Sequence, residues 1–342
     1  MRLINYIKKF IINIKLSSTK RRWKDNSGLK ILISVNDYFN ENRWKKVLLD
    51  IDKGKTCKWD IVFCKNRFEV YKHFPDADIC FLHGFNSKMM ITKEIKPKLL
   101  YFPFQGLEFL KSEFIHDNFK IEKPSSNSSS VAIAEYCIAM LILLSRNLHF
   151  ALYNQFNKKW DQSLMIENNF ISISSLKIGV LGLGNIGKVT GEYFKKLGCF
   201  VAGCDKNINY NLDFIDKWFT LSDLNSFLEF IDVLIVALPL TPETRNLIGF
   251  KELKYLGPSS YIINISRGDI INEKDLIAAL KNKKIKGAVL DVFSNEPLTS
   301  WNKLYKLDNV IITPHIAGNI NLFINNIQKD FLLKALKFSE NV

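Results

Sequence analysis

The sequence has no uncharged apolar run of the ~18 residues that a membrane-spanning helix needs, which argues against an integral membrane protein. It has no CxxC pair and no Cys/His cluster with zinc-ligand spacing, so we expect no bound metal. It also lacks internal repeats. The 6 cysteines are scattered, and several lie within apolar runs, which is typical of buried free thiols in a reducing compartment. We therefore expect a cytoplasmic protein.

Acidic residues are missing from residues 1–24, which carry eight of the 14 net positive charges. The remaining chain is only mildly basic, so the charge does not favour a nucleic-acid-binding protein. On a helix, one face of this segment would carry Ile4, Ile7, Ile11 and Ile14. Because Lys8 and Lys15 fall close to that stripe, we favour a loosely attached extension over a helix lying on a membrane surface.

Short apolar runs alternate with helix-compatible stretches, which predicts an α/β fold with parallel sheets. A first series of strands is predicted at 29–34, 60–63, 78–82 and 98–103. A second is predicted at 176–182, 200–205, 232–239, 261–266, 286–293 and 309–315. The Ser-rich segment 123–130 separates the two series, and the apolar stretch 131–152 predicts one long helix that connects two domains. A final amphipathic helix is predicted at 321–338.

A glycine-rich turn follows the strand at 176–182 and opens a helix, in the pattern G-x-G-x-x-G. This context is the fingerprint of a dinucleotide-binding site. Its residues are Gly182, Gly184, Asn185, Ile186 and Gly187. Gly182 would permit the tight turn, Gly184 the approach of a pyrophosphate, and Gly187 the close packing of helix and strand. Asp205 ends the next strand. A carboxylate at this position binds ribose hydroxyls and repels a 2′-phosphate, which favours NAD over NADP. The positive charge of Lys206 weakens that preference.

Three further residues that can bind or titrate follow apolar strands. Arg267 offers a planar fork that can bind a carboxylate, and His315 is a natural acid/base near neutral pH. Glu296 can accept a hydrogen bond from that imidazole and favour its protonated form. Each has an ordinary alternative as an ion-pair partner, a loop charge or a strand-end cap. Open α/β sheets, however, bind ligands at the carboxyl ends of their strands, which favours a shared role.

The chain resembles the D-isomer-specific 2-hydroxyacid dehydrogenase family, which includes phosphoglycerate dehydrogenases and glyoxylate/hydroxypyruvate reductases. Five ordered segments carry the resemblance: 180–188, 237–248, 263–280, 286–298 and 309–318. The resemblance implies an NAD-dependent oxidoreductase that interconverts a D-2-hydroxy acid and its 2-keto acid. It assigns carboxylate binding to Arg267, acid/base chemistry to His315 and support of His315 to Glu296. It also implies cofactor contacts for a further set of residues: Leu238, Pro239, Ile265, Ser266, Asp291 and Gly318. For Asp291 that contact is the nicotinamide carboxamide; the alternative is a loop-capping carboxylate.

The family resemblance further implies two Rossmann-like domains, one inserted into the other. The NAD-binding domain would span 131–316, the discontinuous substrate domain 29–130 and 317–342, and residues 1–28 would be an extension. The family usually forms homodimers through the cofactor domain and a helical arm. Here that arm would include residues 154–169, with Trp160 as an anchor.

The substrate loop departs from the family pattern, because it contains one glycine where several are usual. Gln105 and Gly106 are the residues that we expect to face the substrate carboxylate. The segment 82–86 is the other expected wall, and we expect His83 and His116 to be ordinary polar residues. This departure leaves glycerate-type, lactate-type and phosphorylated acids open as substrates.

Other functions remain as alternatives. A non-catalytic NAD(H)-sensing regulator on the same fold would not need to keep Arg267, Glu296 and His315 together. A formate dehydrogenase on this fold pairs its histidine with glutamine, where this chain has Glu296. The presence of all three residues, and of glutamate instead of glutamine at position 296, favours the 2-hydroxyacid dehydrogenase over both alternatives.

Overall fold

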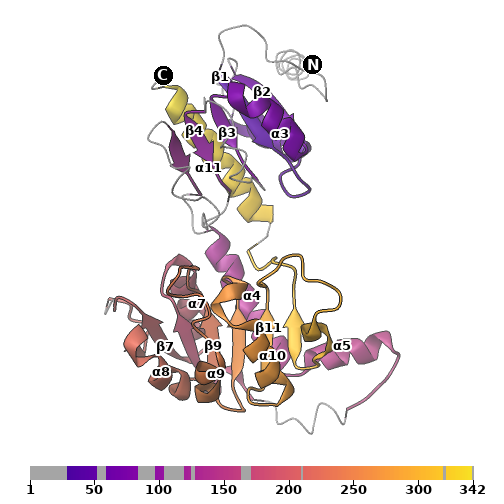
Figure 1. Cartoon of the computed structure of the whole chain (residues 1–342), viewed down its shortest axis with the longest axis vertical. Coiled ribbons are helices and arrows are strands. Elements are labelled where there is room, and N and C mark those ends of the chain that lie inside the picture. Colours follow the sequence, from indigo (N-terminus) through magenta and orange to yellow (C-terminus); the bar gives the residue numbers. More distant parts are fainter. Residues whose placement is uncertain are drawn as a thin grey trace. The chain divides into compact units, whose positions relative to one another are not determined.

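The computed structural model describes residues 29–51, 59–83, 97–103, 119–124, 128–162, 171–208, 211–318 and 321–340. The chain divides into two compact units: unit 1 is Met1–Ser126 with Asn321–Val342, and unit 2 is Asn127–Ile320. Unit 2 is therefore one continuous stretch, flanked in sequence by the two parts of unit 1 (Figure 1). Ser129 and Gly318, near the two ends of unit 2, lie close together, because a Cβ built on Gly318 would lie 3.5 Å from the Cβ of Ser129.

Unit 1 contains a parallel sheet of five strands in the order β2-β1-β3-β4-β5. The strands are β1 (Leu29–Ser34), β2 (Trp59–Cys64), β3 (Ile79–Phe81), β4 (Leu99–Tyr101) and β5 (Lys120–Glu122). Its helices are α2 (Glu41–Ile51), α3 (Arg67–His73), a 3-10 turn (Phe74–Asp76) and α11 (Asn321–Ser339). Phe331 of α11 packs edge to face on Phe81 and Tyr101, with ring centroids 5.3 Å apart in both pairs. The C-terminal helix is thus part of this unit's core.

Unit 2 contains a parallel sheet of seven strands in the order β12-β11-β10-β9-β6-β7-β8. The strands are β6 (Lys177–Leu181), β7 (Phe200–Asp205), β8 (Lys217–Thr220), β9 (Val233–Val236), β10 (Tyr261–Asn264), β11 (Gly287–Leu290) and β12 (Val310–Ile312). The chain builds β7 and β8 on one side of β6 and then returns to place β9 on the other side. In open α/β sheets, ligands bind at the carboxyl ends of the strands where the order reverses in this way.

Helices and turns cover both faces of the larger sheet. The helices are α4 (Ser128–Ser145), α5 (Leu148–Phe156), α7 (Asn185–Lys196), α8 (Leu224–Phe230), α9 (Phe250–Leu256) and α10 (Glu273–Lys281). Short 3-10 turns lie at Ile173–Ser175, Leu221–Asp223, Gly268–Ile270 and Lys303–Lys306. Leu234 and Val236 of β9 pack into one hydrophobic core, and Val233 and Ile235 pack into the other. This burial on both sides explains the unbroken apolar runs in the sequence.

The prediction of a single helix over 131–152 is wrong. α4 ends at Ser145, and α5 begins at Leu148. Asn147 between them has a φ of 52°, a left-handed conformation that Asn tolerates better than most residues, and its N–H donates to the Leu144 carbonyl. Among the described residues, no single helix is long and apolar enough to cross a membrane; α4 and α5 reach that threshold only as a pair bent by 73°.

Candidate active site

The glycine-rich turn lies at the carboxyl end of β6, and two of its glycines are sterically required. Gly182 has a φ of 97°, and a Cβ on it would lie 2.9 Å from the Ala237 carbonyl. A Cβ on Gly187 would lie 1.9 Å from the Gly182 carbonyl oxygen, so helix α7 can approach the turn only with glycine at this position.

The third glycine faces open space. A Cβ on Gly184 would meet no atom within 4 Å, and Gly184 is the N-cap of α7. Asn185 and Ile186 form the start of that helix. The first N–H groups of a helix lack intrahelical partners and carry partial positive charge, which suits a pyrophosphate. These residues therefore fit a dinucleotide.

Asp205, at the end of β7, contacts the glycine-rich turn directly. Its Oδ2 accepts a 2.6 Å hydrogen bond from the Leu183 N–H, and its Oδ1 accepts a 3.3 Å bond from the Asn207 N–H. Lys206 follows it. The pKa of Glu243, after β9, is lowered mainly by a hydrogen bond with Thr241 and, more weakly, by the charge of Lys206. Lys206 therefore lies within electrostatic range of an acidic side chain.

The segments that follow β9 and β10 complete this edge of the sheet. Leu238 is buried, and its Cδ2 would lie 3.0 Å from a Cβ on Gly182. The Pro239 carbonyl accepts a 2.6 Å hydrogen bond from the Thr244 hydroxyl. Ile265 and Ser266 are also buried. Because β6, β9 and β10 are neighbours, these residues lie at adjacent strand ends.

Arg267 is held in a turn organised by the buried side chain of Asn264. The Asn264 Oδ1 accepts hydrogen bonds from the N–H and hydroxyl of Ser266, and its Nδ2 donates to the Arg267 carbonyl over 3.0 Å. Arg267 Nη1 donates to the Ser266 carbonyl over 2.7 Å. A Cβ on Gly268 would lie 2.0 Å from the Phe293 carbonyl carbon, so this turn packs tightly on the loop that leads to Glu296.

His315 and Glu296 form a hydrogen-bonded pair at the ends of β12 and β11. His315 Nδ1 lies 2.8 Å from Glu296 Oε2, and Glu296 Oε1 accepts a 2.9 Å hydrogen bond from the Phe293 N–H. The side chains of His315 and Glu296 are 52% and 36% exposed, so they are accessible to a ligand. His315 has a φ of 56°, which is unusual for a residue with a Cβ.

The pair shifts both pKa values toward the charged forms. The hydrogen bond with Glu296 raises the pKa of His315 above 6.5, although burial opposes it. Burial acts to raise the pKa of Glu296, but hydrogen bonds from His315 and Phe293 outweigh it and bring the pKa below 4.5. The protonated imidazole is therefore favoured, as a proton donor requires.

Asp291 is 1% exposed, and its carboxylate holds the loop that carries His315. Its Oδ1 accepts hydrogen bonds from the Thr313 hydroxyl at 2.5 Å and the Ile316 N–H at 2.9 Å. Its Oδ2 accepts one from the Ala317 N–H at 2.9 Å. Gly318 follows directly and lies against Ser129 and Ile133 of α4. A carboxylate has about four acceptor positions, so Asp291 keeps capacity for one further donor.

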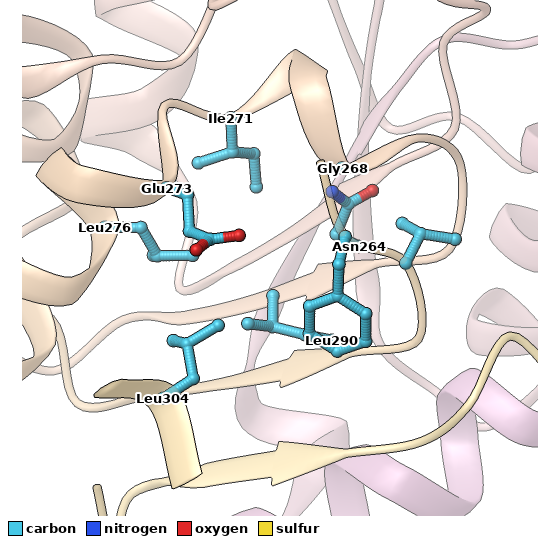
Figure 2. A pocket seen from close by; sticks show the side chains of 9 residues that line it. Asn264, Gly268, Ile271, Glu273, Leu276, Leu290 and Leu304 are labelled. Carbon is cyan, nitrogen blue, oxygen red and sulfur yellow. The ribbon is translucent and has the colours of Figure 1, made fainter. Parts of the chain in front are cut away.

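A small pocket lies beside the Arg267 turn (Figure 2). Its lining is mostly apolar and comprises Asn264, Gly268, Ile271, Glu273, Leu276, Leu290, Val292, Phe293 and Leu304. The Glu273 carboxylate accepts a 2.9 Å hydrogen bond from the Asn302 amide. The lining includes none of Arg267, Glu296 and His315, so this pocket is separate from the candidate catalytic group.

Several residues predicted to contact the substrate fall outside the described residues. These are Gln105, Gly106 and residues 84–86. Outside them too lie His116, which we expect to be an ordinary polar residue, and residues 163–169 of the predicted dimer arm. His83 is described: its Nδ1 lies 2.9 Å from the Asn36 amide nitrogen, and burial lowers its pKa. Within the described ranges, no group of three or more His, Cys, Asp or Glu side chains is arranged to hold a metal ion.

Sequence reasoning did not single out Asn264, Thr313 or Tyr136. Asn264 ends a buried strand, and Thr313 lies two residues before His315, so their positions beside the predicted residues were the available signal. Tyr136 has no such signal, because its hydroxyl reaches Thr313 from 177 residues away.

Comparison with known proteins gives one consistent family. The model of the D-isomer specific 2-hydroxyacid dehydrogenase NAD binding domain matches residues 138–317. D-3-phosphoglycerate dehydrogenase of Methanocaldococcus jannaschii is 30% identical over 249 residues, which is 72% of this chain and 47% of that protein. Glyoxylate reductase of Thermofilum pendens is 32% identical over 194 residues, which is 55% of this chain and 56% of that protein. The chain thus spans about half the length of these curated relatives.

A solved structure supports the fold. A D-isomer specific 2-hydroxyacid dehydrogenase family protein from Aeromonas salmonicida aligns with a TM-score of 0.78 at 24% sequence identity. The alignment covers 92% of this chain and 97% of that chain. At this identity the likeness concerns the fold alone.

Proposed function

The chain belongs to the D-isomer specific 2-hydroxyacid dehydrogenase family, and we propose that it interconverts a D-2-hydroxy acid and its 2-keto acid with NAD as the hydride carrier. The observation that carries the proposal is the 2.8 Å contact between His315 and Glu296. The loop of Glu296 also packs on the turn of Arg267. His315 and Arg267 follow β12 and β10, the two strands that flank β11.

The glycine-rich turn fits the diphosphate of the cofactor, because open space lies in front of Gly184 and the N-terminus of α7. NAD held by these residues would supply the hydride for C2 of the keto acid, or accept it in the reverse reaction. Further cofactor contacts are proposed for Leu238, Pro239, Ile265, Ser266 and Gly318. Asp291 retains acceptor capacity that suits the amide N–H of a nicotinamide carboxamide.

Preference for NAD over NADP is proposed from the charges around the ribose site. Asp205 would accept hydrogen bonds from the ribose hydroxyls and would repel a 2′-phosphate. Lys206 is the neighbouring group that would favour the phosphate.

The side chains divide the chemistry of reduction between them. The guanidinium of Arg267 would bind the substrate carboxylate and fix the 2-keto group in one orientation. Protonated His315 would then donate its proton to the carbonyl oxygen as the alcohol forms. Glu296 would keep His315 protonated and oriented through the hydrogen bond to Nδ1. Nε2 would be the nitrogen that donates to the substrate.

We propose that residues 131–316 form the NAD-binding domain and that residues 29–130 and 317–342 form the substrate domain, as predicted from the sequence. Gln105 and Gly106 would contact the substrate, and the protein would act in the cytoplasm. A homodimer through the helical arm is also proposed. Its support is the exposed apolar surface of Phe156 and Trp160, which are 84% and 91% exposed.

A panel of 2-keto acids, phosphorylated and unphosphorylated, assayed by NADH and NADPH oxidation, tests this proposal. We expect turnover of at least one acid with NADH, and loss of turnover in His315→Ala. Tight NADH binding with no turnover of any acid would instead support the NAD(H)-sensing regulator.

A further inference from the structure

A chain of hydrogen bonds runs from helix α4 to the loop of His315. The Tyr136 hydroxyl lies 2.6 Å from Thr313 Oγ1, and Thr313 Oγ1 lies 2.5 Å from Asp291 Oδ1. An ionised carboxylate only accepts, so the single hydroxyl proton of Thr313 points to Asp291. Thr313 must then accept from Tyr136. The direction of donation is therefore fixed: Tyr136 to Thr313 to Asp291.

Asp291, held by Thr313, in turn binds the backbone of the segment that contains His315. Its carboxylate accepts from the N–H groups of Ile316 and Ala317, and its own carbonyl accepts from the His315 N–H over 2.9 Å. His315 is held in a left-handed conformation with a φ of 56°. A residue with a Cβ persists there only when its surroundings impose it. The bonds to Asp291 are such a constraint.

We propose that Tyr136 is a positioning residue for His315. By fixing Thr313 and the carboxylate of Asp291, it holds the 315–317 loop where the imidazole meets Glu296. The inference rests on the proposed acid/base role of His315, but the positioning itself can be measured without a substrate.

The local charges make His315 a sensitive reporter of this geometry. Within the described residues, the charged groups that act on its imidazole are Glu296, Asp291 and Arg267. The hydrogen bond with Glu296 is the largest influence and raises the pKa of His315. A loop that shifts away from Glu296 must therefore lose part of that elevation. Tyr136 itself remains a donor throughout, because burial raises its pKa well above the ordinary value.

The test uses variants that keep the packing and remove the hydroxyl. Tyr136→Phe retains the ring, and Thr313→Val retains the shape of threonine, whereas Thr313→Ser retains the hydroxyl. Tyr255→Phe is the matched control, because Tyr255 lies on α9 and is 37% exposed. The pKa of His315 is measured by NMR on full-length, histidine-labelled protein, with the His315 signal assigned by its loss in His315→Ala. Thermal unfolding verifies that each variant is folded.

We expect Tyr136→Phe and Thr313→Val to lower the pKa of His315 by roughly 0.5–1 unit, the effect of weakening about one hydrogen bond. Thr313→Ser and Tyr255→Phe should keep the original pKa. With a 2-keto acid substrate, kcat should fall roughly fivefold in the first two variants.

An unchanged pKa of His315 in both Tyr136→Phe and Thr313→Val overturns the proposal, as does a Thr313→Ser value equal to that of Thr313→Val. The result separates this inference from the proposed function. A shifted pKa without turnover of any 2-keto acid supports the positioning role and rejects the dehydrogenase activity. Turnover of a 2-keto acid with an unshifted pKa of His315 supports the dehydrogenase activity and rejects the positioning role.

Discussion

Nδ1 of His315 lies 2.8 Å from Oε2 of Glu296, although the two residues follow different strands and are 19 positions apart. The contact stabilises the fold over a defined pH range. The pKa of His315 is raised, so its contribution is complete below the ordinary value of 6.5 and is lost as the pH rises through the folded-state pKa. The pKa of Glu296 is lowered, so its contribution is present above 4.5 and is lost as the pH falls through the folded-state pKa. The pair therefore stabilises the protein most between pH 4.5 and 6.5.

Glu296→Gln should move the pH profile of reduction. The amide preserves a hydrogen-bonding side chain but removes the charge that raises the pKa of His315. The donor form of the imidazole then disappears at lower pH, so the alkaline limb of kcat/KM should shift to lower pH. An unmoved alkaline limb in initial rates of NADH oxidation across the pH range would show that Glu296 is not the functional partner of His315.

His315→Ala and Arg267→Ala should differ in kinetics. Loss of the acid/base should lower kcat by about 10²–10⁴-fold with a small effect on KM. Loss of the guanidinium should raise KM and also lower kcat, because the side chain both binds and orients the carboxylate. Steady-state kinetics separate the two effects, and isothermal titration should show NADH affinity near the original value in both variants. A loss of NADH binding would contradict their placement outside the cofactor site.

Gly187→Ala and Gly184→Ala should separate folding from cofactor binding. The methyl group at position 187 would lie 1.9 Å from the Gly182 carbonyl oxygen, and we expect a loss of roughly 1–3 kcal/mol of stability or more. The methyl group at 184 meets no atom within 4 Å, and φ there is −69°, so thermal unfolding should be unchanged. NADH should nevertheless bind about tenfold more weakly to Gly184→Ala, a loss of ~1.4 kcal/mol, because the methyl group occupies space needed by the pyrophosphate. Equal effects of the two variants on unfolding would refute this distinction.

Asp205→Ala should reduce the preference for NADH over NADPH, because the carboxylate that repels a 2′-phosphate is removed. The alanine also removes the acceptor for the Leu183 N–H, so Asp205→Asn is the matched variant that removes the charge but keeps an acceptor. We expect both variants to lower the ratio of kcat/KM for NADH to kcat/KM for NADPH. Asp205→Asn should bind NADH more tightly than Asp205→Ala does, because it keeps an acceptor for the Leu183 N–H. Equal kcat/KM values for the two cofactors in the original protein would argue against the role of Asp205.

A chain that begins near Ser27 should fold and turn over normally. Residues 1–24 carry none of the motifs of the reaction, and their structure lies outside the described residues. The measurements are kcat/KM, the oligomeric state by size-exclusion chromatography, and binding to anionic vesicles. Binding of anionic vesicles by the full chain, but not by the truncated chain, would support contact with a membrane surface. Loss of activity on truncation would assign a structural role to residues 1–24.

The sequence predicted most strongly the parts of the fold where burial or backbone geometry restricts residue choice. β7 has the predicted bounds, and α7 ends two residues before Gly198, which has the positive φ expected of a residue beyond a helix. β5 and β8 were not predicted, because KIE and KWFT are short and partly polar edge strands. The break at Asn147 was missed because an apolar run conceals a single left-handed residue.

In the candidate site, too, the sequence predicted the residues marked by local motifs and missed the contacts that depend on tertiary packing. Short sequence motifs mark Arg267, Glu296 and His315, since each follows a recognisable apolar strand. The contact of Tyr136 with Thr313 depends on how α4 packs against the end of β12, and no local pattern encodes that packing. The hydrogen bond of Asp205 to Leu183 likewise arises from two adjacent strand ends.

The closeness of Ser129 and Gly318, near the two ends of unit 2, has a consequence for protein engineering. Gly318 lies against Ser129, so residues 128–318 form a stretch whose termini could be joined by a very short linker. Such proximity is the condition under which circular permutation and domain transplantation succeed. Unit 2 should therefore be transferable as a single cassette into a surface loop of another protein, with its glycine-rich turn intact.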